Sequence, residues 1–518
     1  MSNALTIPGL AVVAARLWPS AEAVVDGEER LSFAELRQRM LECAAAFVAA
    51  GLKKGERVAI WAPNSATWIV ACLGLQAAGG VLVPLNTRFK ADEAGVILAR
   101  SSAVMAVAAE EFLEARYADV VERLDLPAMR RVIRPGGPDW TAFLAAATPA
   151  SRLEAERRLD DLVPEDLSDI MFTSGTTGEP KGAMSAHGQS VRTAMLWAKA
   201  TTLAAGDRFL IVWPFFHCSG YKAGWVADLA VGATSLPVAV LEPTSLLATV
   251  SGEAVSFLPG PPTLFQTLLA LPSRPERMLA TVRVSITGAS AVPPSMIVAM
   301  REELGVRTVL TGYGLTETCG TATMTSPDDP PEVVTTSCGK AIEGVEIACV
   351  GDDGRPVQAG EAGEVVVRGM NVMLGYLDDP EATAEAIDSE GWLHTGDIGV
   401  LDAQGYLRIT DRKKDVFIVG GFNCYPAEIE KMLCAHPAIQ QAAVTGTPDP
   451  RLGEVARAFV VLRPQTQLTE ADLIAWARER MANFKVPRLV SFVDALPTNA
   501  TGKVQKFKLT GSPSSPAG

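Results

Sequence analysis

Residues 167–182 read LSDIMFTSGTTGEPKG, an apolar strand-like segment followed by a loop of glycines and hydroxyl residues and then a lysine. This combination suits a polyphosphate, because glycines let backbone N–H groups approach anionic oxygens, hydroxyls add rotatable donors and lysine supplies charge. It is not a Walker A loop, since Gly-Lys-Ser/Thr is missing and Pro180 precedes the lysine. A flexible polar turn is the alternative for a short Gly/Thr loop, but the length of this string disfavours it. The expected phosphate contacts are Thr173, Ser174, Gly175, Thr176, Thr177, Gly178 and Lys181.

Helical and strand patterns alternate on both sides of this loop in the first half of the chain. Residues 32–51 predict a helix and residues 57–63 a strand. Ser65 is a candidate N-cap for a helix over TWIVACLGLQAA, and residues 81–85 predict the buried strand that follows. Buried strands that alternate with helices predict parallel sheets, with ligand sites at the carboxyl ends of the strands.

The pattern changes near residue 340. Residues 344–369 combine β-branched residues with Gly/Asp turns, which is typical of antiparallel hairpins. The segment after residue 414 then predicts strands and two helices. We therefore expect an α/β protein with a large N-terminal domain of layered α/β subdomains plus a small antiparallel β region, over residues 1–410. A small mobile α+β domain is expected over residues 411–510, and a disordered tail over residues 511–518.

Composition limits the classes of protein that fit. The chain has 518 residues, 48% hydrophobic and 20% charged, and exceeds the roughly 250–300 residues of a single core. The formal charge of −13 gives no general basic field for nucleic acid or anionic lipid. The eight cysteines form no Cys-x-x-Cys pair, which predicts buried free thiols in a reducing cytosol. The N-terminus is a poor signal peptide, and Gln76, Gly79, Gly80 and Pro84 interrupt the apolar run 63–87, so we expect a cytoplasmic protein without a membrane span.

Further short motifs follow the loop in a fixed order: Phe216-His217, YGLTE over residues 313–317, Thr395-Gly396-Asp397, DRKKD over residues 411–415 and Thr501-Gly502-Lys503. Together with the loop they resemble the adenylate-forming superfamily, which includes acyl-CoA synthetases, firefly-type luciferases and peptide-synthetase adenylation domains. The resemblance covers about residues 10–510. It implies an ATP-dependent acyl-CoA synthetase, which makes acyl-AMP and pyrophosphate from a carboxylate and ATP, and then acyl-CoA and AMP.

Adenylation brings two anions together, so the site must neutralise charge and align the reactants. Glu317 follows an apolar strand, where a carboxylate suits a Mg²⁺ that keeps most of its waters and bridges phosphate oxygens. The resemblance assigns that metal to Glu317, the α-phosphate to Thr316 and adenine stacking to Tyr313. It makes Lys503 the lysine that bridges the carboxylate and the α-phosphate. The remaining nucleotide contacts that it implies are Gly288, Ala289, Gly312, Gly314, and, for the ribose, Asp397 and Arg412.

The resemblance also supplies a thiol-transfer step. It places a hinge at Lys414 and coenzyme A at Gly420, Gly421 and Phe422, where bare backbone at Gly421 would line the pantetheine tunnel. His217 is expected to be an aromatic gate beside the acyl group rather than a general base. The acyl pocket candidates by family position are Trp213, His217, Ser219, Tyr221, Lys222, Gly288, Gly312 and Thr318. For Lys222 we expect a stem that reaches solvent or an ammonium that faces a polar group on the substrate.

The segment around His217 bears on the acyl substrate. Residues 214–225, PFFHCSGYKAGW, resemble synthetases of actinobacterial fatty-acid and steroid-ring catabolism, which favours a medium-chain or bulky alicyclic acid. An aryl or cinnamate-type acid is an alternative, as is an acyl-AMP ligase that loads a separate carrier protein. A nucleotide-binding pseudoenzyme is disfavoured, because Lys181, Glu317, Asp397 and Lys503 are all present. The expected partners are a small carboxylic acid, ATP and coenzyme A, and a homodimer is compatible with the sequence.

Overall fold

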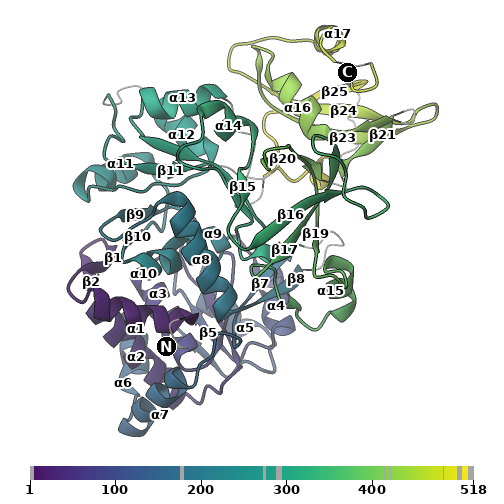
Figure 1. Ribbon diagram of the computed structural model, residues 1–518. Helices are drawn as coiled ribbons and strands as arrows, with labels where there is room; N and C mark the ends of the chain where they lie inside the picture. Colours follow the sequence, from purple (N-terminus) through teal and green to yellow (C-terminus); the bar gives the residue numbers. More distant parts are fainter. Residues whose placement is uncertain are drawn as a thin grey trace. The chain divides into compact units, whose positions relative to one another are not determined.

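The computed structural model describes residues 5–174, 180–271, 276–287, 294–412, 415–419, 422–481, 483–498 and 504–510 (Figure 1). The chain divides into two compact units. Unit one comprises Met1–Gly288, Val292–Ile347 and Val367–Leu393, and unit two comprises Ala289–Ala291, Ala348–Val366 and His394–Gly518. The small domain expected over residues 411–510 stays a prediction; these residues belong to unit two, which also contains residues 348–366 and 394–410. The tail expected over residues 511–518 lies outside the described residues.

A seven-stranded sheet in unit one carries the segment quoted first. Its strand order is β18-β8-β7-β4-β3-β5-β6, and the five strands from β7 to β6 run parallel to their neighbours. Strands β8 and β18 run antiparallel at one side of the sheet. The strands are β3 (Arg57–Trp61), β4 (Val81–Pro84), β5 (Met105–Ala108), β6 (Arg131–Ile133), β7 (Leu167–Ser174), β8 (Pro180–Ala186) and β18 (Gly375–Tyr376).

Helix α3 (Ala66–Ala77) confirms the helix expected in the apolar run. The Ser65 hydroxyl accepts the N–H of Trp68 at 3.1 Å, which satisfies an otherwise unpaired donor of the first turn. Every residue of α3 except Thr67 is buried, and the helix packs against α2 (Phe33–Ala49). The run is thus apolar because protein surrounds it on all sides. Among the residues that the structure describes, no helix has the length and apolar character needed to cross a membrane.

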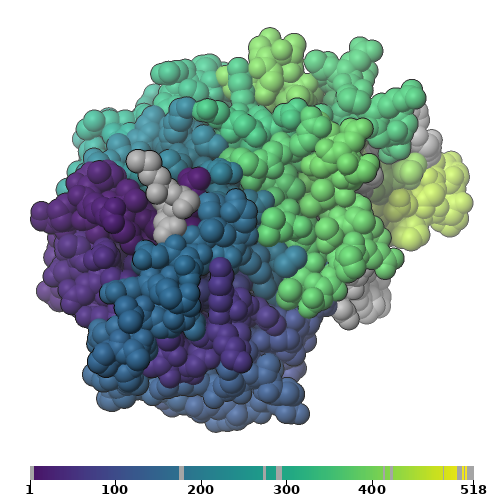
Figure 2. All heavy atoms as spheres, turned by 60° about the horizontal axis from the view of Figure 1, so that its bottom comes forward, coloured from purple at the N-terminus to yellow at the C-terminus, as the bar shows by residue number. Residues whose placement is uncertain are grey.

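The other helices of unit one cover its sheets. Helix α2 also packs on α7, and Figure 2 shows the N-terminal residues adjoining residues near 150 on one face of the molecule. Helices α8 and α10, labelled in Figure 1, pack against each other and against the π-helical segment η2. The segment η2 also contacts strand β9 (Arg208–Ile211). The helices are α1 (Ile7–Leu17), α4 (Ala91–Arg100), α5 (Tyr117–Arg123), α6 (Gly137–Ala145), α7 (Pro149–Asp160), α8 (His187–Thr201), α9 (Cys218–Gly220), η2 (Tyr221–Val226), α10 (Ala227–Val231), α11 (Pro243–Gly252), α12 (Pro262–Leu269), α13 (Pro294–Glu302), η3 (Thr316–Thr318), α14 (Pro331–Thr336) and α15 (Pro380–Ala386).

A second sheet of unit one consists of two groups of strands that a single residue, Phe257, joins. The order β2-β1-β10-β9 is linked to β11-β12 by parallel bridges from Phe257 to Phe209 and to Val284. The strands are β1 (Glu22–Asp26), β2 (Glu29–Ser32), β9 (Arg208–Ile211), β10 (Thr234–Pro237), β11 (Val284–Ile286) and β12 (Thr308–Leu310), and a small sheet joins β13 (Gly312–Tyr313), β14 (Thr323–Met324) and β15 (Lys340–Ala341).

The antiparallel hairpins expected after residue 340 are present. They form a four-stranded sheet of order β16-β17-β19-β20, and the C-terminal part forms a sheet of order β22-β21-β24-β23 with β25 parallel to β24. These elements are β16 (Val345–Val350), β17 (Ala362–Gly369), β19 (Leu393–Leu401), β20 (Leu407–Arg412), β21 (Phe417–Val419), β22 (Phe422–Cys424), α16 (Pro426–Cys434), β23 (Ile439–Asp449), β24 (Gly453–Leu462), α17 (Glu470–Arg478), β25 (Leu489–Phe492) and α18 (Phe507–Thr510). The strands and the two helices predicted after residue 414 are present, the helices as α16 and α17, together with the short α18 that was not predicted.

All eight cysteines are free thiols, as expected. Six are buried, Cys338 is partly buried and Cys434 is exposed. The expectation of burial is therefore wrong for Cys434, which ends the amphipathic helix α16 on its solvent side.

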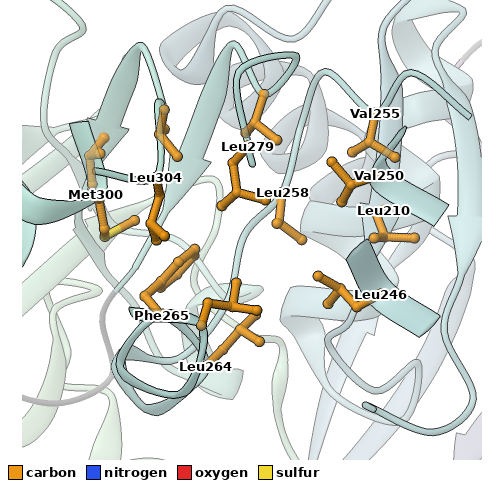
Figure 3. Packing of buried hydrophobic residues seen from close by; sticks show 14 of the residues in the cluster. Leu210, Leu246, Val250, Val255, Leu258, Leu264, Phe265, Leu279, Met300 and Leu304 are labelled. Carbon is orange, nitrogen blue, oxygen red and sulfur yellow. The ribbon is translucent and has the colours of Figure 1, made fainter. Parts of the chain in front are cut away.

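One apolar cluster of unit one offers a test of the packing. Figure 3 shows Leu258 between side chains from α11 and α12, with Phe265 on α12 fully buried. Phe265→Ala should lower the free energy of unfolding by about 3–5 kcal/mol, because it removes the ring and leaves a cavity. Val298→Ala on neighbouring α13, where the side chain is exposed, should change it by less than about 0.5 kcal/mol. Urea unfolding followed by tryptophan fluorescence makes the comparison, and equal losses would contradict the assignment of this core.

Candidate active site

Strands β7 and β8 bring the two ends of the phosphate loop together. Thr173 lies opposite Lys181, and Ser174 lies opposite Pro180 in the antiparallel register. A Cβ at Gly182 would lie 2.8 Å from the Ile170 side chain, so β8 approaches β7 too closely for a larger residue there. The predicted phosphate contacts Gly175, Thr176, Thr177 and Gly178 lie outside the described residues.

Glu317 lies next to these strands. The Tyr376 hydroxyl donates to Glu317 Oε1 at 3.0 Å, and the Thr173 hydroxyl approaches the same oxygen at 3.5 Å. The Lys181 ammonium lies 5.3 Å from the centre of the Tyr376 ring, within cation–π range. Burial, and then the charge of Glu317, raise the pKa of the Tyr376 phenol, so it keeps its proton and acts as a donor. The structure thus gathers three predicted residues around one tyrosine.

Tyr376 was not identified from the sequence. It lies in a short strand of two residues that pairs with β8, and a Gly-Tyr pair alone does not indicate a functional residue. Only the sheet order reveals that this strand lies next to the residues that follow the phosphate loop.

A tight turn presents Glu317. The Thr318 hydroxyl accepts the N–H of Leu315 at 2.9 Å and donates to its carbonyl at 3.0 Å, while the N–H of Met373 donates to the Glu317 carbonyl at 2.8 Å. Gly320 has φ +92°, and a Cβ there would lie 2.6 Å from that of Cys218. Thr318 is fully buried and these bonds give it a structural role; its contact with an acyl group stays a prediction. Thr316 is half-buried in the same turn.

The predicted gate His217 lies beside this turn, because the next residue, Cys218, is packed against Gly320. The Asn64 side chain fixes the backbone that precedes His217. Its amide donates to the Trp213 carbonyl at 2.9 Å, and its carbonyl oxygen accepts the N–H of Phe215 at 2.8 Å. His217 Nδ1 accepts the N–H of Ser219 at 3.2 Å. Burial lowers the pKa of His217, so the imidazole is neutral near pH 7, which suits an apolar gate.

The other acyl-pocket candidates differ in exposure. Trp213 and Ser219 are half-buried, whereas Tyr221 and Lys222 are 0% and 1% exposed. The Tyr221 hydroxyl accepts a hydrogen bond from the Gln76 amide at 2.8 Å. The expectation that the Lys222 stem reaches solvent is wrong, because the ammonium is buried 2.9 Å from Asp169 Oδ1. The alternative expectation, that the ammonium faces a polar group on the substrate, is not supported either, because the ammonium is paired with Asp169.

The predicted adenine-side residues are described in part. Tyr313 pairs with Thr323 in the small sheet and is half-buried, and Gly314 is exposed. A Cβ at Gly312 would lie 2.9 Å from the Thr323 carbonyl oxygen, so a side chain at this position would require the backbone to shift. Gly288 and Ala289 lie outside the described residues.

Unit two holds the predicted ribose contacts. Asp397 on β19 lies opposite Arg412 on β20, so the two residues share one position of the sheet. The Asp397 N–H donates to the Thr395 hydroxyl at 3.1 Å, and that hydroxyl donates to the Val365 carbonyl at 2.7 Å. Gly396 between them has φ +68°, a conformation that favours glycine. The side chain of Arg412 lies outside the described part.

The hinge Lys414 and the expected coenzyme A contacts Gly420 and Gly421 lie outside the described residues, and of Phe422 only the backbone, in β22, is described. Lys503, expected to act in adenylation, also lies outside them. The segment after Lys503 is anchored. Val504 bridges to Thr498, and the Lys506 ammonium lies 2.7 Å from Glu430 Oε1. These contacts hold the described residues on either side of Lys503, Thr498 and Val504.

Comparison with known proteins decides the family. Residues 12–377 match the AMP-binding enzyme family, and residues 428–503 match the AMP-binding enzyme C-terminal domain. The chain belongs to the AMP-binding enzyme family. It is an AMP-forming acid–thiol ligase, as the resemblance implied, and its α/β fold is that of the adenylate-forming superfamily.

Individual relatives are similar to this ligase over nearly their whole length. A 3-(7a-methyl-1,5-dioxo-octahydro-1H-inden-4-yl)propanoyl:CoA ligase of Rhodococcus jostii is 48% identical over 97% of both chains. A feruloyl-CoA synthase of Amycolatopsis is 35% identical, over 95% of this chain and 96% of its own. The o-succinylbenzoate coenzyme A synthetase of Bacillus subtilis, solved with ATP and a magnesium ion, is 28% identical with a TM-score of 0.83, over 97% of this chain and 99% of its own.

The role of the Tyr376 hydroxyl, which donates to Glu317, can be tested directly. Tyr376→Phe removes the 3.0 Å donor and should lower the rate of adenylate formation by about 10-fold or more, with a higher Mg²⁺ requirement, as for other groups that orient a metal-binding carboxylate. Pyrophosphate exchange measured against MgCl₂ concentration gives both quantities. Tyr117→Phe is a matched control in unit one, since it also loses one buried hydroxyl bond, to the Thr87 carbonyl, and should leave the Mg²⁺ requirement unchanged. An identical response from both variants would show that Tyr376 does not orient Glu317.

Proposed function

We propose that this ligase activates a bulky alicyclic carboxylic acid and transfers it to coenzyme A. The carboxylate attacks the α-phosphorus of ATP to give acyl-AMP and pyrophosphate. The thiol of coenzyme A then attacks the acyl carbonyl and AMP leaves. The observation that supports this function is the group of Thr173, Lys181, Glu317 and Tyr376 beside the phosphate-loop strands, in a chain of this family.

The chemistry of Glu317 fits Mg²⁺. Both neighbouring hydroxyls approach Oε1, which leaves Oε2 as the oxygen for a cation. Within the described residues no group of three His, Cys, Asp or Glu side chains could form an all-protein metal site. A single carboxylate is what Mg²⁺ uses when substrate phosphates and waters complete its shell. When bound, the metal would neutralise phosphate charge. Lys181, in the same cluster, is the cation of this chain that we expect to act on the same phosphates.

The acyl preference is proposed from the relatives. The Rhodococcus jostii protein is named for a propanoate on a fused, keto-substituted bicyclic ring, and it is 48% identical to this chain. The Amycolatopsis relative is named for ferulate, an aryl acid, at 35% identity. The higher identity favours the bicyclic propanoate. The cytoplasmic location and the homodimer stay predictions.

A panel of acids distinguishes these substrates. We expect kcat/KM for the bicyclic propanoate to exceed that for ferulate and for octanoate by more than about 10-fold, because each mismatch in an apolar pocket costs transition-state binding. AMP and pyrophosphate should appear with acyl-CoA, measured by chromatography. ADP with orthophosphate would contradict adenylation. A preference for ferulate would transfer the assignment to an aryl-acid ligase, and adenylate that never reaches coenzyme A would favour loading of a carrier protein.

Lys503 separates the two half-reactions. If its ammonium bridges the carboxylate and the α-phosphate, Lys503→Ala should slow adenylate formation by about 10²–10³-fold, the loss typical of a preorganised charge contact. The same variant, given synthetic acyl-AMP and coenzyme A, should form thioester at nearly the normal rate, since we propose that Lys503 leaves the site when the small domain rotates at Lys414.

Pyrophosphate exchange and thioester release measure the two steps in one sample. Lys508→Ala, an exposed lysine in α18, controls for the general loss of positive charge and should leave both steps intact. Equal loss of both steps in the Lys503 variant would mean that this lysine serves both reactions.

Gly421→Leu should give the opposite pattern. We expect adenylate formation to be retained and thioester formation to be suppressed, because a side chain at position 421 would narrow the proposed pantetheine tunnel.

A further inference from the structure

A fully buried ion pair lies beneath the turn that carries Glu317. Lys222 is 1% exposed and Asp169 is 0% exposed, with 2.9 Å between Lys222 Nζ and Asp169 Oδ1. The ammonium also donates to the Ser185 hydroxyl at 2.9 Å. On the other side, the Ser168 hydroxyl donates to Asp169 Oδ2 at 2.6 Å. The pair is therefore hydrogen-bonded at both ends and shielded from water.

The partners of Lys222 come from different elements of unit one. Asp169 lies on β7, which leads into the phosphate loop, and Ser185 lies on β8, which leaves it. Cys319 belongs to the turn that follows Glu317, and its sulfur lies 3.7 Å from Lys222 Nζ and 3.6 Å from the Ser185 hydroxyl. Lys222 itself lies in η2, a few residues after His217. One ammonium thus joins both phosphate-loop strands to the Glu317 turn.

Stability alone does not account for such a pair. Burial is the largest influence on the pKa of Lys222 and acts to lower it, but the attraction of Asp169, Cys319 and Cys218 together outweighs burial. The pKa is therefore raised, and the lysine is charged. Removing two charges from water costs free energy that their attraction often only offsets, and apolar residues of similar volume frequently replace buried pairs without loss. A buried pair that holds four segments in one geometry is more directly explained by the precision it gives to those segments.

We propose that Lys222 is a positioning residue for the nucleotide site, which fixes the Glu317 turn, through Cys319, against the strands that flank the phosphate loop. The inference rests on the proposed function for the role of Glu317, and its contacts all lie in unit one. Lys222 touches neither ATP nor the acid in this scheme. It sets where the Glu317 carboxylate stands relative to Thr173 and Lys181, and so it should affect binding of ATP with Mg²⁺ more than binding of ATP alone.

The first test compares Lys222→Met with the double variant Lys222→Met/Asp169→Asn. The single variant leaves a buried carboxylate without its cation and should lower the unfolding temperature. The double variant removes the unpaired charge and should recover most of that loss. If Lys222 positions Glu317, the double variant still binds Mg²⁺·ATP about 10-fold more weakly in calorimetry, while its affinity for ATP in EDTA changes little. Recovery of stability together with wild-type Mg²⁺·ATP affinity would overturn the proposal. If the single variant does not fold, the double variant carries the test.

The second test leaves the ion pair intact. Cys319→Ala removes the polar atom that the turn presents to Lys222, whereas Cys319→Ser keeps one. We expect a several-fold loss of Mg²⁺·ATP affinity for the alanine variant and near wild-type affinity for the serine variant. Equal behaviour of the two variants would contradict the link through Cys319. Wild-type protein that binds Mg²⁺·ATP but adenylates no acid would reject the proposed function alone, since the binding comparison is independent of the reaction.

Discussion

The antiparallel return of β8 along β7 is the constraint on which the site depends. Most of the seven-stranded sheet is parallel, but after the phosphate loop the chain folds back on itself. Backbone hydrogen bonds between β7 and β8 set the spacing between Thr173 and Lys181. A second antiparallel ladder, between β8 and β18, places Tyr376. A hydroxyl, an ammonium and a phenol are thus held by main-chain geometry. Glu317 lies on a separate turn, outside these strands, so its position in the group must be fixed by contacts other than the strand pairing.

Charge is handled locally in this molecule. The chain carries a formal charge of −13, so its general field does not favour anionic substrates. Near the phosphate loop, Lys181 supplies a cation while the phenol and a hydroxyl face the Glu317 carboxylate. The Lys222–Asp169 pair below adds no net charge, because its two members cancel. It can therefore fix geometry without adding net charge beside the strands that flank the phosphate loop.

Local patterns predicted local structure well. The Ser65 cap, the apolar helix after it and the strand at residues 81–84 follow from capping and hydropathy, and the ordered motifs placed Thr173 and Glu317 in one site. Long-range partners were not predictable in this way. An apolar neighbourhood in the sequence gave no sign that Lys222 pairs with Asp169, since the two are joined only by folding. Tyr376 was missed for the same reason, because strand pairing rather than position along the chain brings it next to β8 and Glu317.

The contact between Cys218 and Gly320 has a consequence for changing the acyl preference of this ligase. A side chain at position 320 would collide with Cys218, so the segment that carries the gate His217 and the turn that carries Glu317 are in direct steric contact. Variant libraries at the predicted acyl-pocket positions 217 and 219 should therefore keep the native residues at positions 218 and 320. A larger residue at either of those two positions would displace the Glu317 turn together with the His217 segment, so we expect selectivity and turnover to change together.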